Sequence, residues 1–452
     1  MNLLAISLIW TTCPEPLFND DLIIATRIIF TSKCGRVSYI FLNNYNQILV
    51  CEQDLNKVEE FLSKVHEADV AVGIPSFNNA PTIEYVIRQA ADGLEENFPS
   101  MKSVIIVSDG NSDDGTREVA ESVSLPQKIC RLVTTYSGVP GKGSAVNLIL
   151  QLAERLNCKA LALVDADLRS ITQEWIRLLL QPIFEGVKFV APKYMRYKYD
   201  GTITNQVAYP FTLTLFGYRI RQPIGGDFGL SRDLVRLLLK TPLWNTEYVP
   251  RFGIDITITC TALAYRMNVG EAFLGVKVHD VKDPASHLGP MFKQVVGALF
   301  ENAYLYKSVW QDIMHVTEPK MFRGGRIFES EPKPFNVNLK VMEDEFVKGF
   351  IERKSLFENI LSEQAFTLLR GCVEESRIGV EDWAKISFNF LKSYQHYSKE
   401  DVLEAYKICW LGRVSTFVKE TLHMSDEEAE EKINSDALTF MRLKPYLLSI
   451  LS

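Results

Sequence analysis

The chain has 452 residues, a length typical of two or three domains at the usual ~100–200 residues each. Hydrophobic residues make up 47% and charged residues 23%, a balance that excludes a wholly disordered chain. The net charge of −7 argues against a general nucleic-acid binder, which would carry a basic excess. It leaves room for an anionic ligand that is held locally.

The cysteines and the apolar runs indicate in which cellular compartment the protein is expected. None of the eight cysteines forms a Cys-x-x-Cys pair, so neither a zinc ribbon nor a redox pair is indicated, and a reducing cytoplasm is expected. No apolar run reaches the ~18–20 residues of a membrane span, so no transmembrane segment is predicted. Met1–Trp10 is apolar but lacks the basic residues of a signal peptide. A buried strand is predicted there, with a short signal or anchor as the alternative.

Residues 1–65 are predicted to form an N-terminal extension. Val37–Leu42 and Gln47–Cys51 flank the turn-like Asn43–Asn46, which predicts a β-hairpin. A helix is expected over residues 55–66, leading into the main domain.

Residues 66–310 show the pattern of an α/β domain, because apolar strand-like runs alternate with helical stretches. The expected strands are Val70–Ile74, Val104–Val107, Leu161–Val164 and Phe189–Ala191, and the expected helices lie near 81–92, 114–123, 142–156 and 172–181. The alternation predicts a parallel, doubly wound sheet. In such sheets ligands bind beyond the carboxyl ends of the strands, which is where polar residues recur in this chain.

The last third is predicted to be helical. Helix-breaking residues indicate a linker over 311–336, namely Pro319, Gly324, Gly325, Pro332 and Pro334. Residues 337–452 then form a helical C-terminal domain, since apolar residues recur at helical spacing, as in Val341, Phe346, Phe350 and Ile351.

Two carboxylates follow the third of these strands, in Asp165-Ala166-Asp167. Such a pair can hold Mg²⁺ or Mn²⁺ on one member while the other orients a ribose or a water, with a diphosphate completing the ligand shell. The structural alternative is that the two acids cap the next helix. By itself the common Asp-x-Asp pattern favours that alternative.

Two further segments change the balance. Ser108–Thr116 follows a strand, and Asp109 can accept hydrogen bonds from a base or ribose, whereas Asp113 or Asp114 suits an Asx turn and helix cap. Pro140-Gly141-Lys142-Gly143 opens a helix, where glycines let the backbone approach an anion and Lys142 adds a cation. The spacing is not that of a P-loop.

These segments resemble, in order and spacing, the nucleotide-sugar domain of a GT-A glycosyltransferase of the family 2 type. The resemblance covers Val70 to about Lys307, and Arg221–Gly229, Phe252–Asp255 and Gly275–His279 sharpen it. The set is similar to the retaining enzymes that make mannosylglycerate and glucosyl-3-phosphoglycerate. It implies a GT-A fold and transfer of a hexose from a UDP- or GDP-sugar to a small acidic acceptor, such as glycerate or 3-phosphoglycerate.

The resemblance also implies roles on the donor side. Contacts to the nucleotide sugar are implied for Pro75, Ser76, Asn78, Asp109, Lys142, Asp165, Gly225 and Gly226. Asp167 and His279 would bind Mg²⁺ or Mn²⁺, with His287 as the rival histidine. For His279 taken alone, a packed histidine at a strand end is the better interpretation.

The catalytic step is also implied by the resemblance. It predicts retention of anomeric configuration by front-side attack, with the leaving phosphate taking the acceptor proton. Lys142 and the metal would neutralise the leaving diphosphate. Asp227 would lie on the sugar hydroxyls and Asp255 would face the reacting centre or the acceptor. Either could support the cationic transition state, and the sequence leaves that choice open.

The acceptor segment departs from the family pattern. The related phosphoglycerate enzymes have Gly-Arg-x-Thr, and the matching residues here are Gly201, Thr202 and Thr204, with Thr202 in place of the arginine. A threonine offers one neutral hydrogen bond instead of a bidentate charged grip, so a free hydroxy acid stays open beside a phosphorylated acceptor. Other cations lie nearby, and for most of them ordinary surface charge is expected: Lys193, Arg196, Lys198, Arg219 and Arg221.

Other functions remain as alternatives. A sugar-1-phosphate nucleotidyltransferase needs a glycine-rich loop after its first strand, which Pro75–Asn79 lacks. A non-catalytic sugar-nucleotide-binding protein would not need all of Lys142, Asp165, Asp167 and His279. A lipid-linked acceptor has little support without a membrane span. The C-terminal helices are open to three roles: forming a homodimer, covering the acceptor site or binding a partner.

Overall fold

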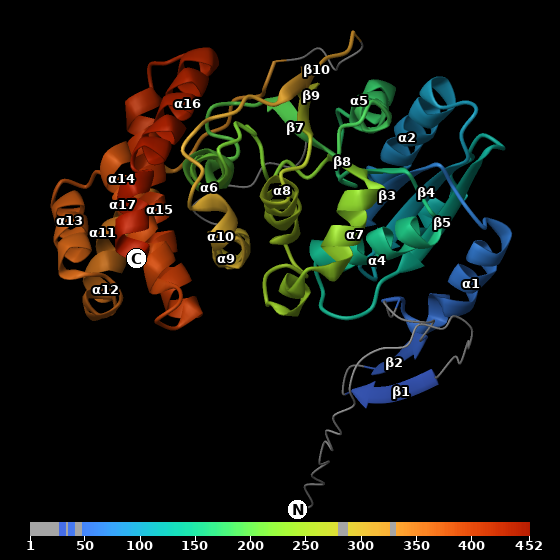
Figure 1. Ribbon diagram of the computed structural model, residues 1–452, viewed down its shortest axis with the longest axis horizontal. Helices are drawn as coiled ribbons and strands as arrows, with labels where there is room; N and C mark the ends of the chain where they lie inside the picture. Colours follow the sequence, from blue (N-terminus) through green and yellow to red (C-terminus); the bar gives the residue numbers. More distant parts are fainter. Residues whose placement is uncertain (1–26, 33–34, 41–47, 279–287, 326–330) are drawn as a thin grey trace, which may run out of the picture. The chain divides into compact units, whose positions relative to one another are not determined.

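The computed structural model describes residues 27–32, 35–40, 48–278, 288–325 and 331–452, which fall into two compact units, 1–48 and 49–452. In the first unit, β1 (Arg27–Ser32) pairs antiparallel with β2 (Gly35–Ile40) (Figure 1). The predicted hairpin of 37–42 with 47–51 lies partly outside the described residues and stays a prediction. Val50 forms a single bridge with Tyr136. The predicted strand at Met1–Trp10 lies outside the described residues.

The second unit is built on an eight-stranded sheet with the order β10-β9-β7-β8-β6-β3-β4-β5. The strands are β3 (Val70–Ser76), β4 (Ser103–Asp109), β5 (Ile129–Thr135), β6 (Ala160–Leu163), β7 (Phe189–Met195), β8 (Phe228–Ser231), β9 (Val269–Val276) and β10 (Lys320–Phe322). All four strands expected from the sequence are present. β10 falls inside the predicted linker and pairs with β9. The predicted boundaries at 66, 311 and 337 stay predictions.

The sheet is mixed, so the prediction of a wholly parallel sheet is wrong in one place. β8 runs antiparallel to both β6 and β7, with Phe228 opposite Leu163. The start of β8 therefore lies at the same edge as the end of β6. This reversal brings the residues just before β8 next to those just after β6, and it decides which side chains meet in the site.

Helices cover both faces of the sheet. The expected helices are confirmed as α1 (Leu55–Lys64), α2 (Ile83–Asn97), α3 (Thr116–Ser122), α4 (Lys142–Arg155) and α5 (Gln173–Phe184). α2 and α5 pack together on one face, whereas α4 packs with α7 (Arg232–Lys240) on the other (Figure 1). In α2 the buried residues follow helical spacing, from Ile83 through Val86, Ile87 and Ala90 to Leu94, and this stripe joins the core beneath the strands.

Three further segments complete the region around the sheet. They are η2 with α6 (Thr204–Ala208 and Tyr209–Phe216), the short η3 with α8 (Pro242–Asn245 and Ile254–Ala264), and α9 with α10 (Gly289–Leu305 and Lys307–Trp310). α8 packs against α4, α6 and α9, and its first turn carries Asp255.

The C-terminal part is helical, as predicted. It comprises α11 (Leu339–Glu352), α12 (Lys354–Ile360), α13 (Glu363–Glu374), α14 (Val380–Ser393), α15 (Lys399–Thr421), α16 (Asp426–Arg442) and α17 (Lys444–Leu451). α15 is buried along most of its length, and α16 packs against α6. Across the described residues, none of the helices is both long and apolar enough to cross a membrane.

Candidate active site

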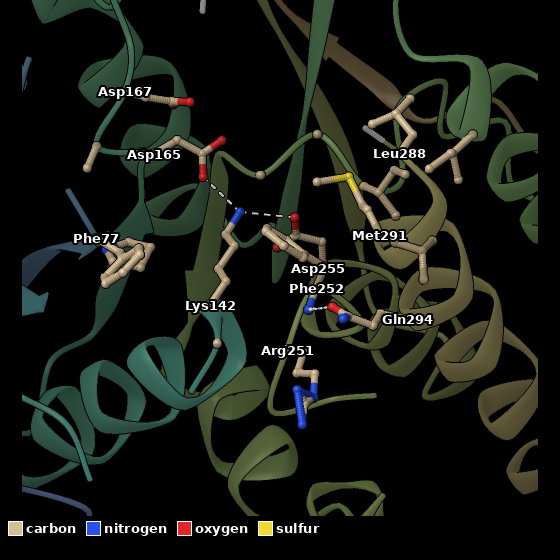
Figure 2. A pocket seen from close by; sticks show the side chains of 18 of the residues that line it. Phe77, Lys142, Asp165, Asp167, Arg251, Phe252, Asp255, Leu288, Met291 and Gln294 are labelled. Atoms are coloured by element: carbon tan, nitrogen blue, oxygen red, sulfur yellow. Dashed lines mark hydrogen bonds and ion pairs between the residues drawn. The ribbon is translucent and has the colours of Figure 1, made fainter. Parts of the chain in front are cut away.

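A cavity of about 630 Å³ opens at the carboxyl edge of the sheet (Figure 2). Its walls come from the ends of β3 and β6, the start of α4, the turn before β8, and α8 and α9. Most of the residues that the sequence nominated line this cavity, namely Pro75, Ser76, Lys142, Asp165, Asp167, Gly201, Thr202, Thr204, Gly225, Gly226 and Asp255. The expectation that polar residues at the strand ends converge is confirmed.

Lys142 bridges two carboxylates on the cavity wall. Its Nζ donates to Asp165 Oδ1 at 2.7 Å and to Asp255 Oδ2 at 3.0 Å, as Figure 2 shows. Burial by itself would lower the pKa of Lys142, but the two carboxylates raise it well above its usual value, so the ammonium stays charged. Burial raises the pKa of Asp255 to about 6, although Lys142 opposes the shift.

Lys277 makes a second bridge, which sequence reasoning missed. Its Nζ donates to Asp165 Oδ2 at 2.8 Å, to Asp227 Oδ2 at 2.8 Å and to the Gly225 carbonyl at 2.9 Å. Burial would raise the pKa of Asp165, but Lys142 and Lys277 together hold it well below its usual range. Lys277 lies two residues before His279, in the segment Gly275–His279 that carried part of the resemblance, so its position in that segment was the available signal.

The antiparallel β8 explains why Asp227 meets Asp165. Asp227 Oδ1 accepts a hydrogen bond from the Asp165 backbone N–H at 2.8 Å. Gly226 between them has φ +90°, and a Cβ there would lie 2.4 Å from Asp165 Oδ2, so only glycine fits the turn. The turn is therefore built around the Asp165 carboxylate.

The glycines at the start of α4 have a different role from the one predicted. A Cβ on Gly143 would lie 1.8 Å from the Val249 carbonyl oxygen. The Gly143 N–H donates to the Arg251 carbonyl and the Ser144 N–H to the Pro250 carbonyl, at 3.0 and 2.9 Å. These two amides bind the chain and are not offered to an anion, so the positive charge that the start of α4 presents to the cavity is that of the Lys142 side chain.

Among the nominated residues that the structure describes, three do not line the cavity. Asp227 has no exposed side-chain surface and accepts hydrogen bonds from Lys277 and the Tyr194 hydroxyl. Asp109 is fully buried and accepts from Ser76 Oγ at 2.8 Å. Asn78 has a left-handed backbone, and its N–H donates to Ser112 Oγ at 2.8 Å. In this geometry all three hold neighbouring segments in place, and their direct contacts to a ligand stay predictions.

Asp167 is the carboxylate that opens to the cavity beside Asp165 (Figure 2). Among the described residues, no group of three His, Cys, Asp or Glu side chains surrounds a metal position. His279 and its rival His287 lie outside the described residues. A single carboxylate still fits Mg²⁺ or Mn²⁺ when a diphosphate and waters supply the other ligands.

The predicted acceptor segment also lines the cavity. Gly201 has φ +72°, and Thr202 is buried, with its Oγ1 hydrogen-bonded to none of the described residues. The Arg196 guanidinium lies against Gly201, since a Cβ there would be 3.2 Å from Arg196 Nη1. Arg196 lines the cavity, and its ion pair with Asp200 is long at 3.6 Å.

Three of the other cations near the acceptor segment have partners outside the cavity, and the fourth, Lys193, does not line it. Arg219 pairs with Glu318 at 3.0 Å and Arg221 with Glu430 at 2.7 Å. Lys198 donates to backbone carbonyls of residues 421 and 424. For Lys193 the structure gives a half-buried strand position outside the cavity lining.

Residues 71–235 match the sequence profile of the family described as glycosyl transferase family 2. The chain carries a family 2 glycosyltransferase domain. Glucosyl-3-phosphoglycerate synthase from Mycobacterium tuberculosis is 25% identical over 261 residues, which are 51% of this chain and 72% of that protein. The enzyme of the same name from Mycolicibacterium smegmatis is 23% identical over 246 residues, covering 51% of this chain and 76% of that one.

A solved structure also resembles this chain over about half of its length. The structure of the Mycobacterium tuberculosis synthase in complex with Mn²⁺, UDP and glucosyl-3-phosphoglycerate aligns with 54% of this chain and 83% of that chain. The sequence identity is 24% and the TM-score 0.42. The predicted class, an α/β GT-A glycosyltransferase with added C-terminal helices, is confirmed by the family match and the observed architecture.

The glycosyltransferase domain also presents cavity residues that sequence reasoning did not nominate. Phe77 is 62% exposed and faces Gly110 at the mouth of the cavity. On the far wall, Phe252, Met291 and Gln294 project from α8, α9 and their flanks (Figure 2). Phe77 and Phe252 lie inside segments that the sequence had marked without being nominated themselves, whereas Met291 and Gln294 come from a helix with no recognisable motif, so only the fold could reveal those two.

Proposed function

We propose that this chain is a metal-dependent, retaining hexosyltransferase that uses a nucleoside-diphosphate sugar and a small anionic hydroxy acid. The observation that carries the proposal is the cluster of Lys142, Asp165, Lys277 and Asp255 at the cavity wall, with Asp167 opening beside it. This arrangement holds a fixed cation and an uncommitted carboxylate next to each other. A sugar diphosphate with its metal ion needs both.

On the donor side, Lys142 faces the diphosphate and offsets the negative charge that grows on it as the sugar leaves. Asp167 would hold Mg²⁺ or Mn²⁺, and the bound cation supplies further charge neutralisation to the leaving diphosphate. Asp165 is held by two lysines, one on each oxygen, so its carboxylate has a fixed orientation from which a remaining lone pair can accept a hydrogen bond from the ribose. The exposed Phe77 ring offers a face on which a base can stack.

The transfer step joins the acceptor hydroxyl oxygen to the anomeric carbon as the bond from that carbon to the diphosphate oxygen breaks. The hydroxyl proton passes to the leaving diphosphate. We assign support of the cationic centre to Asp255, because it lines the cavity, and not to Asp227, which is enclosed. Asp227 is a positioning residue in this proposal, since it holds Lys277 and the Asp165 backbone.

Arg196 is the residue that we assign to the acceptor anion. Its guanidinium lies against Gly201. The family pattern has an arginine directly after this glycine, and here that position is Thr202, which adds a hydroxyl. A guanidinium can bind a carboxylate or phosphate through two parallel hydrogen bonds. The curated relatives are named for a phosphoglycerate product, which supports an acid of that size.

The proposed setting is the cytoplasm. The cysteines that the structure describes outside the first unit are all free thiols, which suits a reducing compartment. A homodimer stays a prediction.

The test is a screen that crosses UDP- and GDP-hexoses with glycerate and 3-phosphoglycerate, with Mn²⁺ and Mg²⁺ varied. Transfer that needs metal and is lost in Asp167→Asn, but kept in the exposed control Asp113→Asn, supports the proposal. A folded protein that transfers nothing in any combination would overturn it. Formation of a nucleotide sugar from a nucleoside triphosphate and a sugar phosphate would favour the nucleotidyltransferase alternative instead.

A further inference from the structure

The acceptor segment continues directly into an unusual helical turn. Gly201, Thr202 and Thr204 line the cavity, and Thr204–Ala208 then form η2, a single π-helical turn that leads into α6. Such turns are rare and are frequently found at functional sites. The structure shows which side chains hold this one in place.

Gln206, in the middle of η2, is bound by two C-terminal helices. Its carbonyl accepts a hydrogen bond from Trp383 Nε1 of α14 at 2.7 Å, and its side-chain oxygen accepts from Arg413 Nε of α15 at 2.9 Å. Arg413 has no exposed side-chain surface and also pairs with Asp436 of α16 at 2.7 Å. A fully buried guanidinium needs partners for its donors, so Gln206 is a required member of this network.

The same helices also hold the two ends of the segment. At the front, Lys198 Nζ donates to the Thr421 and Met424 carbonyls at 2.9 and 2.6 Å, where α15 ends. A lysine at a helix C-terminus meets carbonyls that lack partners within the helix. At the back, the Tyr209 hydroxyl donates to Asn434 Oδ1 of α16 at 2.9 Å. α14, α15 and α16 stand close together beside α6 in Figure 1.

We propose that α14, α15 and α16 position the acceptor-binding segment, so that acceptor binding depends on the C-terminal third of the chain. Gln206 is the central positioning residue, and Lys198 is a second one. This inference rests on the proposed assignment of Gly201–Thr204 to the acceptor. It gives the C-terminal helices a defined task that the sequence alone left open.

The test compares three variants of the full chain. Gln206→Met keeps the length of the side chain but removes the oxygen that Arg413 binds, and Lys198→Met removes the contacts to the end of α15. Ser393→Ala is the matched control, because its hydroxyl bonds within the C-terminal helices, to the Ile360 and Asn389 carbonyls. We expect the KM for the acceptor to rise about tenfold in the first two variants, with the KM for the donor unchanged.

Amide hydrogen exchange over residues 200–208 provides a readout that does not need activity. It should quicken about tenfold in Gln206→Met and Lys198→Met and stay unchanged in Ser393→Ala. If exchange over 200–208 is unchanged in both variants, or quickens equally in the control, the inference is overturned. If the wild-type protein transfers no sugar, the proposed function fails, while the exchange result still decides whether the helices position this segment.

Discussion

Replacing Lys277 by methionine is the sharpest test of the ionic cluster. Lys277 is 5% exposed and contacts Asp165, Asp227 and the Gly225 carbonyl at 2.8 to 2.9 Å. The variant leaves the fully enclosed Asp227 without its ammonium partner, while Asp165 keeps Lys142 alone. Removing one partner of a buried ion pair costs about 3–5 kcal/mol, because the remaining charge has lost both its solvent and its counter-ion.

The matched control is Lys188→Met. Lys188 pairs with Asp233 at 2.6 Å, but the two side chains are 42% and 57% exposed, so the expected cost is about 0–1 kcal/mol. The two variants should therefore differ by at least about 2 kcal/mol in free energy of unfolding at neutral pH. Urea unfolding followed by tryptophan fluorescence measures this difference.

The pH dependence adds a second check. Burial raises the pKa of Asp227, and Lys277 is the main influence that opposes the shift. Without Lys277, folded Asp227 binds a proton more tightly than it does in the unfolded chain, so lowering the pH stabilises the variant relative to wild type. The deficit of Lys277→Met should shrink toward about pH 5. A loss within about 1 kcal/mol of that in Lys188→Met, or a deficit independent of pH, would refute the description of this cluster.

The remaining predictions concern the metal, the pH profile and the acceptor. Asp167→Asn should lower kcat/KM at least about 100-fold without changing urea unfolding, because the cation loses its protein ligand; near-normal transfer would contradict the assignment. The pKa of Asp255 is raised to about 6 by burial, so activity should fall as the pH drops through 6, and Asp255→Asn should remove that limb of the kcat/KM profile. An acid limb of the kcat/KM profile that persists in Asp255→Asn would rule out Asp255 as its cause. Because folded Asp255 also binds its proton more tightly than the unfolded chain does, the stability that it contributes should fall as the pH rises from about 4 through 6. Arg196→Met should raise the KM for an anionic acceptor about tenfold or more, whereas Arg219→Met, whose ion pair lies outside the cavity lining, should leave it unchanged; equal effects would point to a non-specific loss of charge.

Much of the donor side could be predicted from local sequence. Strand-forming runs before Pro75, Asp109 and Asp165 place those residues at one edge of the sheet, because parallel strands that are linked by helices end on the same side. Helix α4 begins at Lys142, as its flanking glycines indicated. Each of these features depends on residues that are neighbours in the chain.

Other features depend on contacts between residues far apart in the sequence. Gly143 looked like part of an anion site, but it makes room for the Val249 carbonyl. Asp227 was expected at the sugar hydroxyls, which stays a prediction, and the reversed strand β8 makes it the partner of Lys277, a role that the sequence did not indicate. No local pattern marks which of several neighbouring strands will run antiparallel.

The local sequence was therefore enough for the class of fold and for the edge of the sheet at which Asp165, Asp167 and Lys142 meet the cavity. The tertiary structure decided how those charges are balanced and what supports the acceptor wall. Lys277 reaches Asp165 across 112 residues of chain, and Arg413 reaches Gln206 across 207. The physical reason is that a buried charge or amide is satisfied by whatever the fold packs against it, and packing is not encoded by spacing along the chain.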